Sequence, residues 1–84
     1  MNIKLQNGHE AEVSHEVRSD GSVLLTATAG ESTHLHTLTL GAVDQPLPDH
    51  YTDEHLQKDL ADARQFAAAM AVSKQRKIAL LKNI

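Results

Sequence analysis

The first half of the chain alternates apolar and polar residues with a period of two, and small turn-forming residues interrupt the alternation at intervals. Such a pattern is typical of short strands that bury one face and expose the other. Four segments follow it, namely residues 3–5, 11–17, 23–29 and 33–40. The pattern therefore predicts an antiparallel β-meander of three or four strands over residues 1–40.

The segments between these strands carry residues that favour tight turns. Asn7-Gly8 is the strongest hairpin signal, because both residues accept a positive φ angle. Ser19-Asp20-Gly21-Ser22 and Gly30-Glu31-Ser32 mark the next two turns. We therefore expect each strand to pair with its neighbour in the sequence.

The alternation also assigns a core-facing side to each strand. In the second and third strands this side consists of apolar residues and one histidine: Ala11, Val13, His15, Val17, Val23, Leu25, Ala27 and Ala29. The fourth strand is ambiguous, because Leu35 shares one side with threonines while the other side mixes two histidines with two leucines. We assign the even positions to the core, with the histidines toward its open end: His34, His36, Leu38 and Leu40.

A connector over residues 41–51 separates the strands from the rest of the chain. Pro46 and Pro48 bias the residues before them toward extended backbone, so this connector is expected to be semi-rigid. Thr52 or Asp53 can then cap a helix.

The helix predicted after this connector covers residues 52–83, a stretch without glycine or proline. Apolar residues recur in it at the 3-4 spacing of an amphipathic helix: Leu56, Leu60, Ala63, Ala67, Met70, Ile78 and Leu81. The sequence as a whole predicts a single α+β domain over residues 1–84, in which a three- to four-stranded meander precedes one long C-terminal helix.

This helix is longer than the sheet that it must cover. About 31 helical residues span roughly 46 Å, whereas a strand of about eight residues spans roughly 26 Å. The helix must therefore break near Ser73-Lys74 or project beyond the sheet. Projection would leave the last apolar residues without cover in their own chain: Ile78, Leu80, Leu81 and Ile84.

The middle of the predicted helix, residues 66–72, is apolar around its whole circumference. A helix of this kind is usually covered on more than one side, which favours a second helix from another subunit or partner. Alanine is also the best helix former and is often simply exposed. Both interpretations are open at the level of sequence.

Charge is divided unevenly along a chain whose formal net charge is -3. Residues 1–43 carry two basic and five acidic residues, residues 44–63 carry one basic and six acidic residues, and residues 64–84 carry five basic residues and no acid. Acids at the start and bases at the end of one helix stabilise its macrodipole, by roughly 0.3 to 1 kcal/mol per well-placed charge. The same basic end also suits an acidic surface on another copy or a protein partner, and less well a nucleic acid.

Composition narrows the possible chemistry. The chain has no cysteine, so it has no disulfide, no thiolate nucleophile and no cysteine-based zinc site. It shows neither a long apolar run nor a hydrophobic N-terminal signal region, and we expect a cytoplasmic protein without a membrane association. Only Tyr51 and Phe66 are aromatic, so the core must be built from aliphatic residues.

Six histidines are many for a chain of 84 residues. His34 and His36 share a strand face at a spacing that metal sites use, and a third ligand would have to come from His15 or His9. No acidic residue stands at a suitable spacing, so we expect histidines of the core or its rim, with no metal and no other cofactor. Ser14-His15-Glu16 has the residue types of a catalytic triad, but neighbours in a strand point to opposite faces. We therefore predict no enzyme active site.

The function that these observations favour is a non-enzymatic protein-interaction or assembly module, which forms a homo-oligomer or binds a protein partner through its C-terminal helix. The predicted interface combines apolar and basic residues of that helix: Phe66, Met70, Lys74, Lys77, Ile78, Leu81 and Lys82. One alternative is a nucleic-acid-binding protein that uses the basic helix end, although an isoelectric point near 6.0 and the lack of an aromatic platform argue against it. A second alternative is a small metal-site protein built on His34 and His36.

No sequence motif identifies a family. In layout alone, the chain resembles small cysteine-free accessory and virion proteins of bacteriophages, in which strands precede a single helix. This resemblance implies a structural or accessory role in a bacteriophage, and it makes the virion an alternative location to the cytoplasm.

Overall fold

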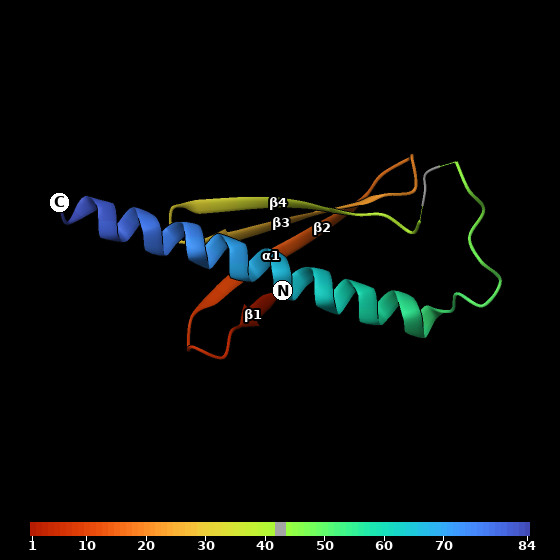
Figure 1. The fold of residues 1–84 in the computed structure, drawn as a ribbon, viewed down its shortest axis with the longest axis horizontal. Helices are drawn as coiled ribbons and strands as arrows, with labels where there is room; N and C mark the ends of the chain where they lie inside the picture. Colours follow the sequence, from red (N-terminus) through yellow and green to blue (C-terminus); the bar gives the residue numbers. More distant parts are fainter. Residues whose placement is uncertain (42–43) are drawn as a thin grey trace.

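The computed structural model describes residues 1–41 and 44–84, and these form one sheet and one helix (Figure 1). The strands follow the order β1-β2-β3-β4 in the sheet, and each runs antiparallel to its neighbours. The predicted α+β class, a meander followed by one C-terminal helix, is confirmed. The elements are β1 (Asn2–Lys4), β2 (Glu10–Val17), β3 (Val23–Ala29), β4 (Ser32–Leu38) and α1 (Asp53–Lys82).

The first two hairpins close with the same three-residue loop. In each, the N–H of the residue before the loop donates over 2.8 Å to the carbonyl of the residue after it: Leu5 to His9, and Arg18 to Ser22. The third loop residue, Gly8 or Gly21, has a φ angle of 87°. A tight turn followed by a glycine in the left-handed region is the common form of a three-residue hairpin loop.

The Asn7-Gly8 signal predicted the right hairpin for a reason that is only half correct. Gly8 adopts a positive φ angle, whereas Asn7 does not. Asn7 contributes through its side chain instead, since its Oδ1 accepts the N–H of His9 over 3.0 Å. In the second loop, Oδ1 of Asp20 accepts the N–H of Ser22 over 2.9 Å in the same way. The short polar side chain stabilises the turn, and the following glycine supplies the backbone conformation.

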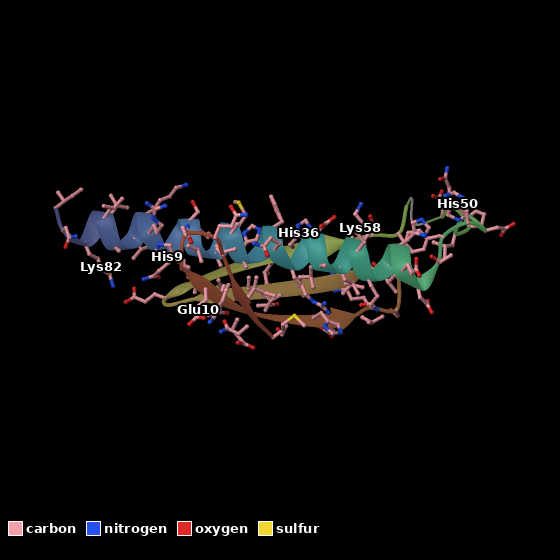
Figure 2. The ribbon with its side chains drawn as sticks, turned by 90° about the horizontal axis from the view of Figure 1, so that it is seen from below. His9, Glu10, His36, His50, Lys58 and Lys82 are labelled. Atoms are coloured by element: carbon pink, nitrogen blue, oxygen red, sulfur yellow. The ribbon has the colours of Figure 1, made fainter. Side chains whose placement is uncertain are left out.

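Helix α1 lies across one face of the sheet, and no helix of the described residues covers the other face (Figure 2). The residues buried between the two layers are small, and Leu25 is the largest fully buried side chain. We term this region the alanine seam, because alanine side chains let the helix approach the sheet closely. It consists of Ala11, Val13, Leu25, Ala27 and Ala29 in the sheet and Ala63, Ala67, Ala68, Ala71 and Val72 in the helix.

Two residues that the alternation assigned to the core, His15 and Val17, are exposed instead, and Val17 is exposed to 72%. Both lie toward the β2–β3 turn, which diverges from the helix (Figure 1). Alternation predicts the side of a strand that faces the core, but it does not predict how far along the strand the helix extends. In β4 the assignment is confirmed, because the even positions are partly buried while Leu35 is 61% exposed.

Helix α1 is continuous from Asp53 to Lys82, so the break considered near Ser73 is absent from it. The helix projects instead, and its last turns extend past the β3–β4 turn (Figure 1). Leu80 and Leu81 in these turns are exposed. The predicted projection beyond the sheet is therefore confirmed at the C-terminal end.

Polar contacts hold the first turns of α1. The backbone N–H of Thr52 donates to Nδ1 of His55 over 3.1 Å, which satisfies a donor at the helix start. The hydroxyl of Tyr51 donates to a carboxylate oxygen of Asp59 over 2.7 Å, and its ring stacks on the His55 ring at 5.5 Å between centroids. These contacts fix the direction in which the helix leaves the connector.

Candidate protein-interaction surface

Strand β4 forms one edge of the sheet, so half of its backbone groups lack a neighbouring strand. The loop that joins it to β3 contains two residues, Gly30 and Glu31, and Ala29 pairs with Ser32 across this loop. A two-residue loop is flanked by a hydrogen-bonded pair, and such pairs then alternate along the strands. The even residues of β4 therefore bond to β3. The N–H and C=O groups of the odd residues point away from the sheet, and these residues are Thr33, Leu35 and Thr37.

A contact from the helix supports this assignment. Nζ of Lys74 donates to the carbonyl of Thr33 over 2.9 Å, which requires that carbonyl to point away from β3. Within residues 1–41 and 44–84, no hydrogen bond outside the sheet ladder reaches the backbone of Leu35 or Thr37. The centre of the edge thus presents free donors and acceptors to solvent.

Large apolar side chains flank this open edge on both faces. On the helix side, the Phe66 ring lies 5.1 Å from the His36 ring between centroids, and it remains 50% exposed. Met70 follows one helical turn later and is 38% exposed. On the outer face of the sheet, the exposed side chain of Leu35 lies directly on the edge strand. We term the open β4 backbone together with Leu35, Phe66 and Met70 the β4 edge surface.

Basic residues of α1 border a hollow of about 380 Å³ at the start of β4. Ile78 is partly buried in this hollow, so the expectation that Ile78 lacks cover in its own chain is wrong. The reason is that α1 is tied to the β3–β4 turn, where Oε1 of Gln75 accepts the N–H of Glu31 over 2.9 Å. The hollow is lined by Glu31, Ser32, Thr33, Lys74, Lys77 and Ile78.

The close approach of Gln75 also explains the glycine in this turn. A Cβ atom on Gly30 would lie 2.7 Å from Cδ of Gln75, which is closer than side chains approach one another. Gly30 therefore lets the helix side chain lie directly on the turn. The start of β4 and the second half of α1 are fixed relative to each other by this contact.

The structure divides the seven predicted interface residues. Four of them lie along the side of α1 that faces β4, at positions separated by three or four residues: Phe66, Met70, Lys74 and Lys77. Ile78 is partly buried, as described above, and Leu81 is 65% exposed beyond the sheet. Lys82, near the C-terminal end in Figure 2, forms an ion pair with Glu31 over 2.6 Å. Both side chains of that pair are largely exposed, so it contributes little to stability.

Sequence reasoning missed Leu35 and the edge itself. Leu35 is the one leucine on the threonine-rich side of the fourth strand, and this feature of the sequence could have indicated an exposed apolar residue there. The edge depends on which strands pair, and no local pattern reports that β4 lacks a second neighbour. The surface predicted from the helix alone therefore did not include the strand edge.

The histidines do not converge on a metal position. Within the described residues, no group of three or more His, Cys, Asp or Glu side chains is placed to hold an ion. His15 and His36 both lie opposite Leu25, in the strands on either side of it. They are therefore about 10 Å apart at the backbone, with Leu25 between them. Phe66 occupies the space beside His34 and His36.

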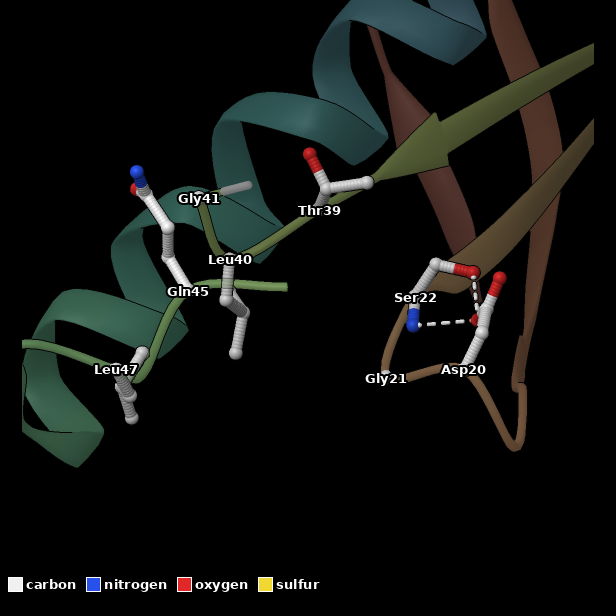
Figure 3. A pocket seen from close by; sticks show the side chains of 8 residues that line it. All are labelled: Asp20, Gly21, Ser22, Thr39, Leu40, Gly41, Gln45 and Leu47. Atoms are coloured by element: carbon white, nitrogen blue, oxygen red, sulfur yellow. Dashed lines mark hydrogen bonds between the residues drawn. The ribbon is translucent and has the colours of Figure 1, made fainter. Parts of the chain in front are cut away.

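A further hollow, of about 180 Å³, lies between the β2–β3 turn and the segment after β4 (Figure 3). Asp20 is the ionisable residue among its lining residues, and its Oδ1 accepts the hydroxyl of Ser22 over 2.6 Å as well as the Ser22 N–H. These two hydrogen bonds lower the pKa of Asp20. The carboxylate is thus committed to the turn, and the lining residues in the described ranges provide no histidine or lysine that would activate Ser22.

No protein-family model, curated protein or solved structure matches this chain. In the ranges that the structure describes, no helix combines the length and the apolar composition needed to cross a membrane. The functional interpretation therefore depends on the geometry of the β4 edge surface.

Proposed function

We propose that this protein is a non-enzymatic protein-interaction module that assembles through the β4 edge surface. One observation carries the proposal: an open strand edge is flanked on both faces by exposed apolar side chains, Leu35 on one face and Phe66 with Met70 on the other. A strand from a partner can bond to the free backbone groups of such an edge, while the flanking side chains supply apolar contacts. The two kinds of contact occur together at this site.

The two edges of the sheet differ in how far they are protected. Proteins avoid unwanted edge pairing by keeping edge strands short or by placing charged side chains on them. At the opposite edge, β1 is three residues long and carries Lys4. The part of β2 that extends beyond β1 is also short, and it carries the charged residue Glu16. β4 is seven residues long, and among the described contacts a single side chain, that of Lys74, reaches its outer backbone. The β4 edge is therefore the one suited to binding.

The alternative functions draw less support from the arrangement of side chains. Two of the basic residues in the second half of α1 already contact their own chain, since Lys74 binds Thr33 and Lys82 binds Glu31. This leaves fewer cations for nucleic-acid phosphates. A role as an accessory or virion protein of a bacteriophage is a specific form of the assembly proposal, and the likeness of layout alone supports it.

Photo-cross-linking in the cells that produce the protein tests the proposal. A benzophenone amino acid replaces Phe66, and in a matched control it replaces Gln65, which is exposed and points about 100° away around the helix. We expect the substitution at Phe66 to give a specific covalent adduct with a protein, and the control to give none. Adding Leu35→Asp to the same chain should abolish the adduct while the circular dichroism spectrum stays unchanged.

Equal adducts at both positions, or an adduct that persists with Leu35→Asp in a folded chain, would contradict the proposal. The mass of the adduct also reports what has been bound. It distinguishes a second copy of the chain from a different protein.

A further inference from the structure

We infer that the occupant of the β4 edge surface is a second copy of this chain, related by a twofold axis so that the two β4 strands run antiparallel to each other. This inference rests on the proposed function and specifies its partner. The two sheets then join into a continuous sheet with both α1 helices on the same face. The interface is isologous, as in most dimers of identical chains.

The positions of the free backbone groups place the axis at Leu35. The residues whose N–H and C=O groups point outward are Thr33, Leu35 and Thr37, with Leu35 at the centre. A twofold axis there sets Thr33 opposite Thr37 of the second copy, so that every free group on the central edge gains a hydrogen-bonding partner. Leu35 meets its own copy on the outer face, where it is otherwise mostly exposed.

The same axis brings the two helices side by side. Helix α1 packs over β3 and β4, and neighbouring strands lie about 4.8 Å apart. The two helix axes would therefore lie roughly 10 to 14 Å apart, slightly more than the 8–10 Å of helices in direct contact. Large side chains are needed to fill this gap, and Phe66 and Met70 stand on that side of the helix.

Two contacts show which part of the helix lies level with the axis. Phe66 is beside His36, and Lys74 reaches Thr33, so the helix position level with Leu35 is close to Ala68. An antiparallel pair of helices centred there sets Phe66 of each copy opposite Met70 of the other. The apolar residues of the edge surface thus meet at the centre.

Charges on this side of the helix are complementary about the same centre. Asp62 and Lys74 are equally far from Ala68 in the sequence, on opposite sides of it, and so are Asp59 and Lys77. The twofold axis therefore sets each aspartate opposite a lysine of the second copy. Lys74 exchanges the Thr33 carbonyl for Asp62, which frees that carbonyl to pair with the second β4. A parallel arrangement of the helices would instead oppose like charges.

The expected contact area is modest. Helices that overlap over about 28 residues meet along roughly 42 Å, and a strip about 10 Å wide gives about 400 Å² for each copy. The paired strand edges add about 200 Å², for a total near the lower limit of about 600 Å² per copy in stable interfaces. We therefore expect a reversible dimer whose population depends on concentration.

Charge reversal tests the arrangement in the purified full-length chain. Asp62→Lys and Lys74→Asp should each raise the dimer dissociation constant by about tenfold or more, because each variant faces like charges twice across the axis. The double variant should restore the constant to within about threefold of the wild type. Arg76→Asp makes the same change of charge as Lys74→Asp on another side of the helix, and it should leave the constant unchanged. Analytical ultracentrifugation over a range of concentrations measures these constants.

A cysteine cross-link tests the register. The natural chain has no cysteine, so the variant Leu35→Cys can form a disulfide between protein chains only with a second copy. Facing residues in a hydrogen-bonded pair lie about 5.5 Å apart at Cα, which suits a disulfide. We expect Leu35→Cys to form a covalent dimer in a glutathione buffer far faster than Val17→Cys. Val17 is more exposed than Leu35 but lies in β2, away from the β4 edge.

A wild type that remains monomeric up to millimolar concentration would overturn the inference. A double variant whose dimer dissociation constant is as high as that of either single variant would overturn it as well. If Phe66 then still cross-links to a different protein in cells, the proposed interaction module stands and the second copy is excluded as its partner. If neither association is found, both proposals fail.

Discussion

Helix α1 contributes to the alanine seam with one side and to the β4 edge surface with the adjacent side, and the two sides carry side chains of opposite size. The buried side uses Ala67, Ala68 and Ala71, whereas the side toward the β4 edge carries Phe66 and Met70. The largest apolar residues of the helix thus stand outside the core, and each remains partly exposed. Small side chains therefore form the packed core, whereas the large apolar side chains lie beside the open strand, at the surface proposed for association.

The small side chains on one side of the helix and the large ones on the other have a common physical cause, the short distance between helix and sheet. Three alanines are joined by one valine and one leucine on the sheet side, and the helix side is alanine with one valine, so the two layers pack closely and leave little room for a larger side chain. A phenylalanine in the sequence of this helix must therefore point elsewhere. Its place beside the open strand follows from the small size of the seam residues, and it contributes Phe66 to the proposed binding surface.

The largest expected effect on stability comes from removing the one large side chain of the seam. Leu25→Ala should lower the free energy of unfolding by about 2–5 kcal/mol, because Leu25 is fully buried and its neighbours cannot fill the cavity. Phe66→Ala should cost less, about 1 kcal/mol, since half of that side chain already contacts water. Urea unfolding of both variants at a concentration where the chain is monomeric measures the two effects.

Equal costs for these two substitutions would show that Phe66 belongs to the core, and the comparison would fail. If Leu25→Ala does not fold, Leu25→Val provides a smaller cavity at the same position. It should cost about 0.5–1.5 kcal/mol, as expected for the loss of one buried methylene group.

The close approach of the two layers can be tested by adding volume to the seam. Ala68→Leu should destabilise the fold by about 1–3 kcal/mol, because Ala68 has no exposed surface and a larger side chain must push the helix away from the sheet. Ala69→Leu is the matched control, since Ala69 is the next residue and is exposed. It should change the free energy of unfolding by less than about 0.5 kcal/mol. A neutral Ala68→Leu would show that the seam has spare room.

The hairpin loops hold the strands in the register that the seam requires, and their glycines should be sensitive as well. Gly8→Val and Gly21→Val should each cost more than about 1 kcal/mol, because both glycines have a φ angle of 87° that a β-branched residue avoids. Gly8→Asn should cost less, since asparagine tolerates the left-handed region. Similar urea midpoints for Gly8→Val and the wild type would contradict the importance of this loop conformation.

The sequence predicts much of the seam and little of the edge surface, for reasons that differ between them. Alternation places Leu25 and Ala27 on the core side of their strand, and glycines at the turns separate the strands, so the meander follows from local patterns. Helical spacing likewise places Ala63 and Ala67 on the buried side of α1. These signals are local because each depends on residues a few positions apart.

The edge surface depends on relations that no local pattern contains. Leu35 is exposed on an open edge only because β4 is the last strand of the meander, and Phe66 lies beside it only because of how the helix crosses the sheet. The same crossing leaves His15 and Val17 uncovered and partly buries Ile78. The sequence indicated Phe66 and Met70 from the helix alone, whereas the surface proposed from the structure also includes the sheet edge, which no local pattern indicates.

The smallest expected effect on stability concerns the first turns of α1, which belong neither to the alanine seam nor to the β4 edge surface. The hydrogen bond from the Tyr51 hydroxyl to Asp59, together with partial burial and the negative charge of Asp59, raises the pKa of Tyr51 from 10.0 to about 12. The folded chain therefore retains this proton more tightly than the unfolded chain does. The stabilisation is complete below pH 10 and is lost as the pH rises through about 12.

Comparison of the wild type with Tyr51→Phe isolates this contribution, because the lysines that also titrate in alkaline solution are common to both chains. We expect the difference between their urea midpoints to be constant up to pH 10 and to shrink toward pH 12. A spectrophotometric titration of the wild type should place ionisation of its single tyrosine above the ordinary value, since the chain has no tryptophan to obscure it. A midpoint difference that stays constant throughout would mean that the Tyr51–Asp59 contact does not form in solution. The first turns of the helix would then depend on the contact between Thr52 and His55 and on the partly buried Leu56, and the alanine seam would hold the rest of α1 unchanged.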